Sequence, residues 1–522
     1  MPRFRMCPFD SNGAFHPMAA SHELLRLAVR GAAASISAAG GALGVQVIST
    51  VVLARLLTPA DFGVVTMVTT FSLLVVSFGL NGFTDAIIQF EDVDHATASN
   101  LFWLNTGAGL VLAVAFAAAG SLLARFYGNP LVENVTRGLS LGIFIQAGSV
   151  IHLALLKRAM CFGVASTNDV IGRVANTAVS IMLACSGWGY WALVAGIVAQ
   201  QFSLTIGSWW FCKWRPSLPR HTGKTGDMIR FAAKVYGNYS VAYATQNIDN
   251  LIVGWRFNAM ALGFYKKAFD LFALTASQLV APLNHVALAA LSRLGQDHVR
   301  LRQYLSRSLG MVAFIGMAAS ADLTLIGKDV VRLVLGPKWS ESGRIFEIFG
   351  PGIGAMLLCI SVGWIHLSIG KPERWLKWNL AVFAATVPMF LVALHWGPSG
   401  VAAAWSISYW IFLIPAFWYA GRPIGFGASC LLAAIWRYIA GAVVAGIAAA
   451  AIIRGTSISG LISGKASALE AITLTTILFI SLYLTAVILF FGSFAPLRQI
   501  ANLFQELTPS RKSSPPIPYE IT

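Results

Sequence analysis

Long apolar runs alternate with short polar connections along almost the whole chain. Each run is close to the roughly 20 apolar residues that a helix needs to cross the hydrocarbon core of a bilayer. Proline and glycine stand at the breaks, for example at Pro59 and at Gly336 with Pro337, because proline lacks a backbone donor and glycine relaxes a turn. The pattern predicts about 14 membrane-spanning helices. They are expected at residues 31–54, 62–82, 99–122, 136–156, 168–187, 190–211, 230–255, 266–290, 306–327, 343–369, 375–396, 399–420, 433–453 and 470–492.

Composition favours a membrane protein. Apolar residues make up 57% of the 522 residues, charged residues only 11%, and the mean hydropathy is +0.70. A soluble domain carries about 25% charged residues. Because no connection is long enough for a folded soluble domain, the predicted fold class is an all-α polytopic membrane protein.

The net charge of +16 does not indicate nucleic-acid binding, because Lys and Arg lie mainly in short connections between apolar runs. Six cysteines are scattered without metal-ligand spacing. The run TGKTGD (222–227) lacks the first glycine of a phosphate loop, because Leu218 stands in its place. We therefore expect no metal, no cofactor, no nucleic-acid partner and no enzymatic activity.

Lys and Arg also predict the orientation. With the N-terminus in the cytoplasm, roughly twice as many of them fall in inside connections as in outside ones, which favours cytoplasmic N- and C-termini in a bacterial inner membrane. One inside connection, 85–99, is acidic and dissents, although acidic residues count little in this rule. Met18 opens a second plausible start, so residues 1–17 are expected to be disordered or to precede the true start.

Three pairs of connections resemble each other at a separation of roughly 200–210 residues, as a parallel repeat of six helices predicts. They are ARLLTPADFGVV (54–65) with WRFNAMALGFYKKA (255–268), ARFYGNPLVENVTRG (124–138) with VRLVLGPKWSESGRI (331–345), and SGWGYWALVAG (186–196) with LHWGPSGVAAAW (394–405). The predicted organisation is a cytoplasmic segment 1–30, a first six-helix lobe 31–211, a basic linker 212–229, a second lobe 230–420, two further helices within 421–492 and a cytoplasmic tail 493–522.

The runs LLTPADFG, GWGYWALV, NIDNLIVGWRFNAMALGFY and VVRLVLGPKW resemble landmark segments of the oligosaccharide flippases. These are the polysaccharide-transporter members of the multidrug/oligosaccharidyl-lipid/polysaccharide exporter superfamily, and the resemblance extends from about residue 24 to 490. It implies two bundles around a central cavity and transfer of an undecaprenyl-diphosphate-linked oligosaccharide to the outer leaflet. The acidic residues within 91–94 depart from the basic residues often found in relatives.

Such a cargo needs a polar path, because a charge buried in hydrocarbon without partners costs several kcal/mol. Arg suits a diphosphate through its bidentate fork, and amides and phenols suit sugars. Ionisable and amide residues within the apolar runs are therefore the candidates. The predicted substrate site comprises Arg30, Arg55, Arg173, Lys234, Tyr243, Gln246, Asp249, Asn250 and Arg256, and the predicted coupling-ion residues are Asp249 and His285.

Each candidate has a structural alternative. Arginines at helix ends and Lys234 commonly snorkel to the headgroups, and Arg173 could neutralise Asp169 four residues earlier. Asp249 lies deep in its run, and Arg256 is about 10 Å further along the helix axis, too far for a direct ion pair. Asp249 therefore needs a partner from another helix.

The leading prediction is a flippase for lipid-linked oligosaccharide, with membrane lipid and the polysaccharide polymerase machinery as further partners. A small-molecule exporter of the related multidrug class is the nearest alternative, although it would favour acidic sites for cationic drugs. A membrane-embedded glycan polymerase or ligase is the alternative from another class, and it usually carries a large outer loop that this chain lacks.

Overall fold

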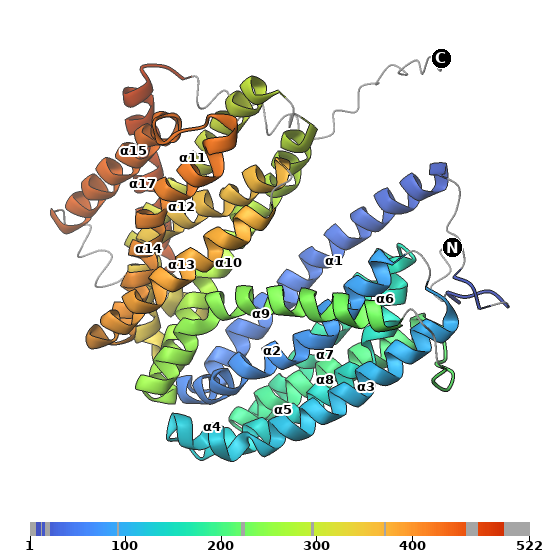
Figure 1. Cartoon of the computed structure of the whole chain (residues 1–522). Coiled ribbons are helices and arrows are strands. Elements are labelled where there is room, and N and C mark those ends of the chain that lie inside the picture. The colour runs from blue at the N-terminus through green and yellow to red at the C-terminus, as the bar shows by residue number, and fades with distance from the viewer. Residues whose placement is uncertain are drawn as a thin grey trace, which may run out of the picture. The chain divides into compact units, whose positions relative to one another are not determined.

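The computed structural model describes residues 7–11, 13–15, 21–90, 93–220, 225–293, 297–369, 372–455 and 468–494. Within these ranges, the side chains of residues 21–33, 78–81, 238, 242, 280–290, 292, 293, 367 and 372 lie outside the description. The predicted N-terminal and C-terminal cytoplasmic segments and part of the acidic connection therefore fall wholly or partly outside it. Figure 1 shows that the described chain is built from helices.

Every apolar run predicted from the sequence coincides with one helix or with two successive helices. The first half comprises α1 (Ser21–Leu56), α2 (Pro59–Gln89), α3 (His95–Ala118), α4 (Gly120–Tyr127), α5 (Leu131–Ala147), α6 (Val150–Arg158), α7 (Phe162–Cys185) and α8 (Tyr190–Phe211). The second half comprises α9 (Thr225–Arg256), α10 (Ala259–Arg293), α11 (His298–Leu335), α12 (Ser340–Ser368), α13 (Pro372–Ala393), α14 (Gly397–Gly421), α15 (Ala428–Gly455) and α17 (Ala468–Phe491).

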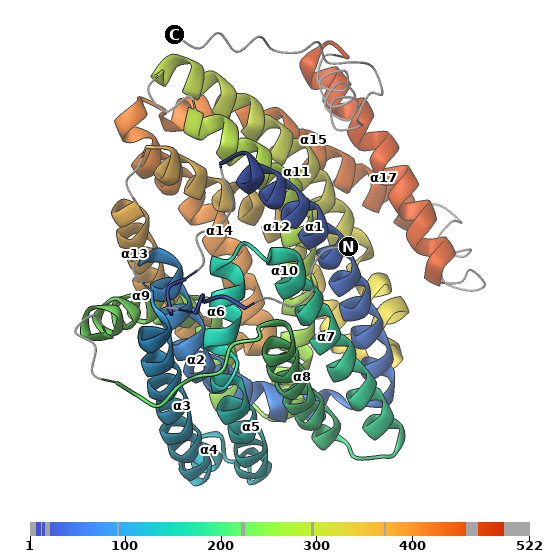
Figure 2. The same cartoon turned by 90° about the vertical axis from the view of Figure 1, so that its right-hand side faces the viewer.

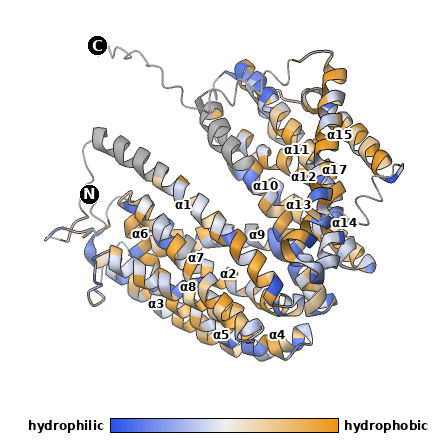
Figure 3. Cartoon of the chain, turned by 180° about the vertical axis from the view of Figure 1, so that it is seen from behind, coloured by the Kyte–Doolittle hydropathy of each residue, from blue (hydrophilic) through white to orange (hydrophobic). Residues whose placement is uncertain are grey.

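Not all of these helices are apolar enough to identify as spans by themselves. Nine stretches of the described residues are long and apolar enough to cross a membrane, and ten if the bent pair α5 and α6 counts as one span. Helices α7, α9 and α10 are not among them. The polytopic helical fold is thus confirmed, whereas the number of 14 spans stays a prediction. Hydrophilic residues otherwise gather near helix ends and in connections (Figure 3).

The chain packs into two compact units. The first contains residues Met1–Asp270, Val331–Ile345 and Lys377–Ala404, and the second contains Leu271–Val330, Phe346–Leu376 and Trp405–Thr522. These units cross the predicted lobe boundaries, so the division into lobes 31–211 and 230–420 stays a prediction.

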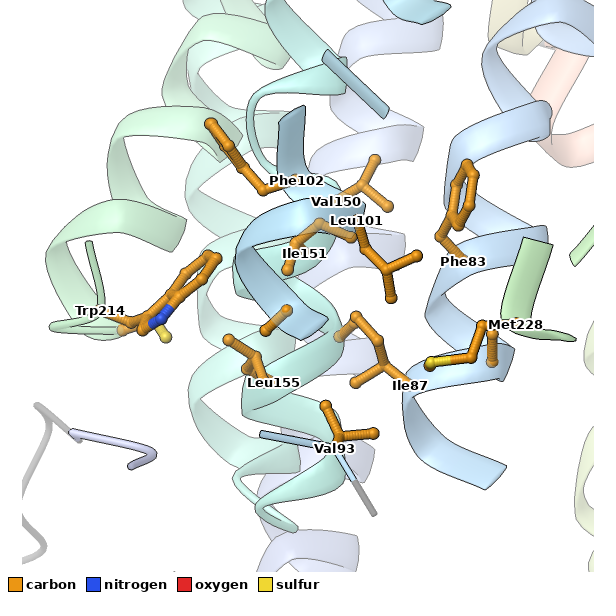
Figure 4. Packing of buried hydrophobic residues seen from close by; sticks show 14 of the residues in the cluster. Phe83, Ile87, Val93, Leu101, Phe102, Val150, Ile151, Leu155, Trp214 and Met228 are labelled. Atoms are coloured by element: carbon orange, nitrogen blue, oxygen red, sulfur yellow. The ribbon is translucent and has the colours of Figure 1, made fainter. Parts of the chain in front are cut away.

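In the first unit, α7 packs between α1 and α8, α5 contacts α3 and α8, and α2 lies against α5, α6 and α9. Figure 2 shows α7 and α8 side by side. Phe83 and Ile87 of α2, Phe102 of α3 and Leu155 of α6 meet in one buried apolar cluster, which Met228 of α9 joins (Figure 4). This cluster ties α9 to helices of the first half of the chain.

In the second unit, aromatic rings and backbone-directed hydroxyl groups hold the helices together. Phe272 of α10 stacks on Phe349 of α12 with ring centroids 4.8 Å apart. The Tyr483 hydroxyl of α17 donates to the Phe314 carbonyl of α11 over 2.8 Å. Helix α15 packs along α17, so the two additional C-terminal helices form part of this unit.

The first pair of repeated connections has matching geometry. Helix α1 ends at Leu56 and α2 begins at Pro59; 200 positions later, α9 ends at Arg256 and α10 begins at Ala259. These breaks place Leu56, and not Arg55, opposite Arg256, one residue away from the register suggested by the sequence comparison. The residues that cap the starts of α2 and α10 match as well.

Thr58 and Asn258 occupy equivalent N-cap positions. The Thr58 hydroxyl accepts from the Asp61 backbone N–H at 3.3 Å, and Asp61 Oδ2 accepts from the Thr58 backbone N–H at 2.9 Å. Asn258 Oδ1 accepts from the Ala261 backbone N–H at 2.8 Å. Both side chains satisfy a backbone donor that a helix leaves unpaired at its start, so a cap follows the same break in each copy.

Two equivalent glycines allow α2 and α10 to cross at close range. A Cβ on Gly63 would lie 1.7 Å from the Ala259 carbonyl oxygen, and one on Gly263 would lie 1.9 Å from the Pro59 carbonyl oxygen. The contact is reciprocal, since each glycine faces the first residue of the other helix. The starts of α2 and α10 therefore pack against each other through equivalent residues.

The other two pairs of connections share left-handed glycines. Gly128 and Gly336 have φ angles of +63° and +98°, while Gly189 and Gly397 have φ angles of +54° and +74°. Glycine adopts this region without the steric cost that a side chain brings. All three pairs thus have the matched backbone that a parallel repeat predicts.

Candidate functional site

Helices α7 and α9 carry most of the predicted site residues and are also too polar to identify as spans. Arg173 lies on α7, and Lys234, Tyr243, Gln246, Asp249, Asn250 and Arg256 lie on α9. A polar helix in a membrane protein must turn its polar side chains toward other helices or toward water, because lipid offers them no partner. These two helices are therefore the first place to seek a polar path.

Asp249 is fully buried, and a neighbouring helix supplies its partner. The Tyr265 hydroxyl of α10 donates to Asp249 Oδ2 over 2.7 Å, and both side chains are 0% exposed. The carboxylate also interacts electrostatically with Lys266. The sequence indicated that Asp249 needs a partner outside its own helix, and α10 provides it because the two helices fold back at the Asn258 cap.

Further polar groups surround this carboxylate on α9. Asn250 is 1% exposed, and its side-chain amide donates to Asn247 Oδ1 over 3.4 Å. The half-buried Tyr243 ring stacks on Tyr239 with centroids 6.1 Å apart. Gln246 is exposed. The buried and half-buried side chains form a polar patch that hydrocarbon alone would not stabilise.

Two lysines on α10 extend the polar patch, and the sequence analysis did not select them. Lys266 Nζ lies 2.8 Å from Asp270 Oδ1, with 26% of the lysine side chain exposed. Lys267 Nζ lies 4.1 Å from the centroid of the Phe62 ring of α2. Adjacent lysines near the start of an apolar run are a costly feature, and that was the available sequence signal. Lys266 thus places a cationic group near the buried Asp249 carboxylate.

Arg55 and Arg256 behave as helix-end residues. Arg55 Nη2 donates to the Leu333 carbonyl over 3.0 Å, which satisfies a carbonyl in the last turn of α11. The exposed Arg256 guanidinium lies 5.8 Å from the Phe257 ring centroid. Neither contact reaches the Asp249 patch, so the helix-end alternative accounts for the contacts that both arginines make.

A separate polar pocket of about 420 Å³ lies among α1, α5, α6, α7 and α8. Lys157, Asp169 and Gln201 contribute to its lining. Arg173 Nε donates to Asp169 Oδ2 over 2.8 Å, as their spacing predicted, and Arg173 Nη1 reaches Gln46 Oε1 of α1 at 3.5 Å. The hydrogen bond from Arg173 to Gln46 thus links α7 to α1 next to this pocket.

The remaining candidates are only partly placed. Lys234 is exposed on α9, in keeping with the snorkelling alternative. Arg30 lies on α1 and His285 on α10, and both side chains lie outside the described residues. The structure brings Tyr243, Asn250 and Asp249 together along α9, whereas Arg173 pairs with Asp169, which lines the pocket among α1, α5, α6, α7 and α8.

The sequence analysis also did not select Asp322, a carboxylate on α11 in the second unit. Asp322 of α11 accepts from the Thr476 hydroxyl of α17 over 3.2 Å. It stands in an apolar stretch without a nearby motif, so only its rarity at that depth could have identified it.

Comparison with known proteins identifies the family. Residues 52–344 match the family described as polysaccharide biosynthesis proteins. The lipopolysaccharide biosynthesis protein WzxC of Escherichia coli (strain K12) is 24% identical over 338 residues, which cover 63% of this chain and 65% of that protein. The succinoglycan biosynthesis transport protein ExoT of Rhizobium meliloti (strain 1021) is 20% identical over 352 residues, covering 67% and 71%. The chain thus spans a little under two thirds of WzxC.

Solved structures confirm the fold. The lipid II flippase MurJ in an inward closed conformation matches with a TM-score of 0.71 at 12% identity, covering 88% of this chain and 98% of that one. An inward-facing multidrug resistance MATE family transporter of the MOP superfamily matches with a TM-score of 0.61 at 15% identity, covering 74% and 94%. The helical architecture of this multi-pass bacterial membrane protein is that of these transporters, and the chain belongs to the polysaccharide biosynthesis protein family.

Proposed function

We propose that this protein moves an undecaprenyl-diphosphate-linked oligosaccharide from the cytoplasmic to the outer leaflet of the bacterial inner membrane, for capsule, exopolysaccharide or O-antigen synthesis. Family membership and relatives named for lipopolysaccharide and succinoglycan production support this cargo class. The observation that carries the proposal is the polar patch on α9 and α10, with buried Asp249 and half-buried Lys266 in a helix pair that belongs to a membrane fold.

The chemistry of the cargo explains this polarity. A diphosphate needs fixed cations and a sugar chain needs amides, hydroxyls and aromatic faces, whereas the lipid tail stays in the bilayer. Lys266 and Lys267 are added to the predicted substrate residues as diphosphate contacts, and Asn250, Gln246 and Tyr243 are the proposed sugar contacts. Arg55 and Arg256 would act at the ends of the path, since their contacts are with helix ends and a ring.

The proposed mechanism is alternating access by two six-helix lobes, 31–211 and 230–420, with both chain termini in the cytoplasm. The matched connections support the repeat on which such a mechanism rests. Asp249 and His285 are the proposed coupling-ion residues, and the enzyme that polymerises the delivered units is a proposed partner. We propose no catalytic role for the chain.

A multidrug exporter is the second candidate, because a MATE transporter has a similar fold. This candidate is less favoured, because Lys266 and Lys267 belong to the polar patch. Their positive charge would repel a cationic drug.

Deletion of the gene tests the cargo. Lipid-linked repeat units should accumulate on the cytoplasmic side of the membrane, measured by their protection from a glycosidase added to spheroplasts. Complementation with the intact chain should restore access. Repeat units that reach the outside at the normal rate without the protein would refute the proposal, and changed drug tolerance with normal glycan export would support the exporter.

The role of Asp249 can be separated from its contribution to stability. Asp249→Asn keeps an acceptor for the Tyr265 hydroxyl but removes the titratable charge, so the folded protein should persist while transport is lost. Asp227→Asn is the matched control, because it removes an exposed carboxylate from the first turn of the same helix and should leave transport unchanged. Normal transport by Asp249→Asn at several pH values and sodium concentrations would exclude Asp249 as a coupling residue.

A further inference from the structure

A short hairpin closed by Phe9 and Phe15, both of which precede Met18 in the sequence, packs against the start of α3 in the first unit. Phe9 and Phe15 form an antiparallel bridge, and the Gly13 carbonyl accepts from the His95 backbone N–H at the start of α3 over 2.9 Å. Phe9 is 6% exposed. The sequence analysis expected residues 1–17 to be disordered or to precede the true start, whereas residues 7–11 and 13–15 have a defined structure, held by two aromatic rings and a backbone hydrogen bond.

The segment that follows α8 packs on the same hairpin in an alternating pattern. Cys212 and Trp214 are 1% and 3% exposed, whereas Lys213 and Arg215 are exposed. The alternation is that of an extended strand, which sends successive side chains to opposite sides. The Trp214 ring centroid lies 6.3 Å from that of Phe9. Lys213 and Arg215 therefore lie on the side of the strand opposite the buried Cys212 and Trp214.

These two segments enclose a pocket of about 670 Å³. Phe9 and Asp10 of the hairpin form one wall, and Trp209, Lys213 and Arg215 line the remainder, with Trp210, Trp214, His95, Cys7 and Cys212. Asp10 is engaged in the hairpin turn, where its Oδ1 accepts from the Ala14 backbone N–H over 2.9 Å. The pocket is thus basic and aromatic, with one carboxylate occupied in a turn.

A basic pocket suits an anion, and the position of this pocket indicates where that anion comes from. Trp209 and Trp210 end the apolar helix α8 and are 39% and 60% exposed. Exposed tryptophans at the end of a span lie at the level of the lipid headgroups, and adjacent Lys and Arg attract anionic lipid. We propose that this pocket binds the phosphate of an anionic membrane phospholipid, with Lys213 and Arg215 on the phosphate oxygens. The site goes beyond the proposed function, because this lipid is not the transported cargo.

Titration of the full-length chain with dioleoyl phosphatidylglycerol, followed by native mass spectrometry from detergent, tests the site. Lys213→Gln with Arg215→Gln should weaken the tightest lipid binding at least about tenfold, because charge-assisted hydrogen bonds are lost. Arg220→Gln with Arg230→Gln removes the same charge outside the pocket, from the end of the described connection and from the start of α9, and should change binding less than about twofold. Equal binding by the first variant, or equal loss in both, would overturn the proposal.

One further variant tests the wall that the hairpin forms. A chain that starts at Met18 lacks the Phe9 wall and should also bind more weakly; full affinity there would remove the hairpin from the site.

Competition distinguishes the sources of the phosphate. Phosphatidylglycerol should occupy the site in preference to farnesyl diphosphate, which stands in for a polyprenyl-diphosphate carrier, and to inorganic phosphate. Preferential binding of farnesyl diphosphate with the same dependence on Lys213 and Arg215 would overturn the phospholipid assignment in favour of the cargo. Equally tight binding of inorganic phosphate would overturn the assignment to a lipid.

Discussion

The Asp249 carboxylate shows how a single buried residue is stabilised in this protein. Its Oδ2 accepts from the Tyr265 hydroxyl, and Lys266 on the next position of α10 interacts with its charge. The spacing from Arg256 excluded an ion pair within α9, but it could not identify a phenol on the following helix. A partner on another helix depends on how the two helices are rotated, which local spacing does not contain.

Removal of the Tyr265 hydroxyl should therefore leave the carboxylate less well satisfied. Tyr265→Phe is expected to lower the free energy of unfolding by about 1–3 kcal/mol and to reduce transport. Thermal unfolding in detergent and glycan export measure the two effects. Tyr236→Phe is the matched control, since its hydroxyl donates to the Leu74 carbonyl on α2 over 3.1 Å. Equal losses from both variants would show that Tyr265 acts only through packing stability.

Burial also sets the reactivity of Cys212, which lies just beyond α8. Burial raises the pKa of its thiol to about 12, so at pH 8 only about one molecule in 10⁴ is the reactive thiolate. A variant whose sole cysteine is Cys212 should label slowly with a maleimide, and faster as the pH rises. A variant with only the exposed Cys7 is the control. Rapid labelling of Cys212 at pH 7 would contradict the buried position.

At the scale of elements, the starts of α2 and α10 occupy equivalent positions of the repeat and pack against each other. Gly63 and Gly263 let α2 and α10 approach until the carbonyls of Ala259 and Pro59 occupy the space of a side chain. The sequence pattern indicated that the two connections are related, since both run from a basic residue to glycine. It could not indicate that the two related connections touch, because contact between them depends on the fold.

Alanine at either crossing glycine should push the helices apart. Gly63→Ala and Gly263→Ala are each expected to destabilise the protein by about 1–3 kcal/mol or more, because backbone atoms cannot yield as a side chain can. Gly44→Ala on α1 is the control, as no atom lies within 4 Å of its added Cβ, and it should be neutral or stabilising. Thermal unfolding distinguishes them. Equal behaviour of all three variants would refute the close crossing.

At the scale of the whole molecule, the predicted parallel repeat and the predicted 14 spans imply that both chain termini lie on the same side of the membrane. The matched breaks and left-handed glycines recur in the same order in both halves. Helices α7, α9 and α10 do not qualify as spans by apolar length, so counting by hydropathy alone would give a different topology. The sequence repeat is the better guide, because the proposed function requires polar helices inside the bundle.

Reporter fusions test the predicted topology. A fluorescent protein that folds only in the cytoplasm should be active after residue 492 and inactive after residue 128, whereas a periplasmic phosphatase should give the reverse pattern. A fusion after residue 257 tests whether α9 crosses the membrane, and it should report the outside. Cytoplasmic signals after residues 212 and 257 together would show that α9 does not span the bilayer.

The sequence by itself determined the features that depend on neighbouring residues. The positions of the helices, the membrane class, the family resemblance and the paired connections followed from apolar periods, from proline and glycine at breaks, and from the order of short motifs. These signals are local, because a span of about 20 apolar residues is stable in a bilayer whatever surrounds it.

Only the tertiary structure decided which polar groups meet. It paired Asp249 with Tyr265, placed Lys266 near that pair, joined Arg173 to Gln46 across α1 and α7, and seated the N-terminal hairpin on the segment after α8. Helix rotation and crossing set these contacts, and they arise from the packing of many side chains together. A residue's type indicates that it needs a partner, but the packed helices determine which partner it finds.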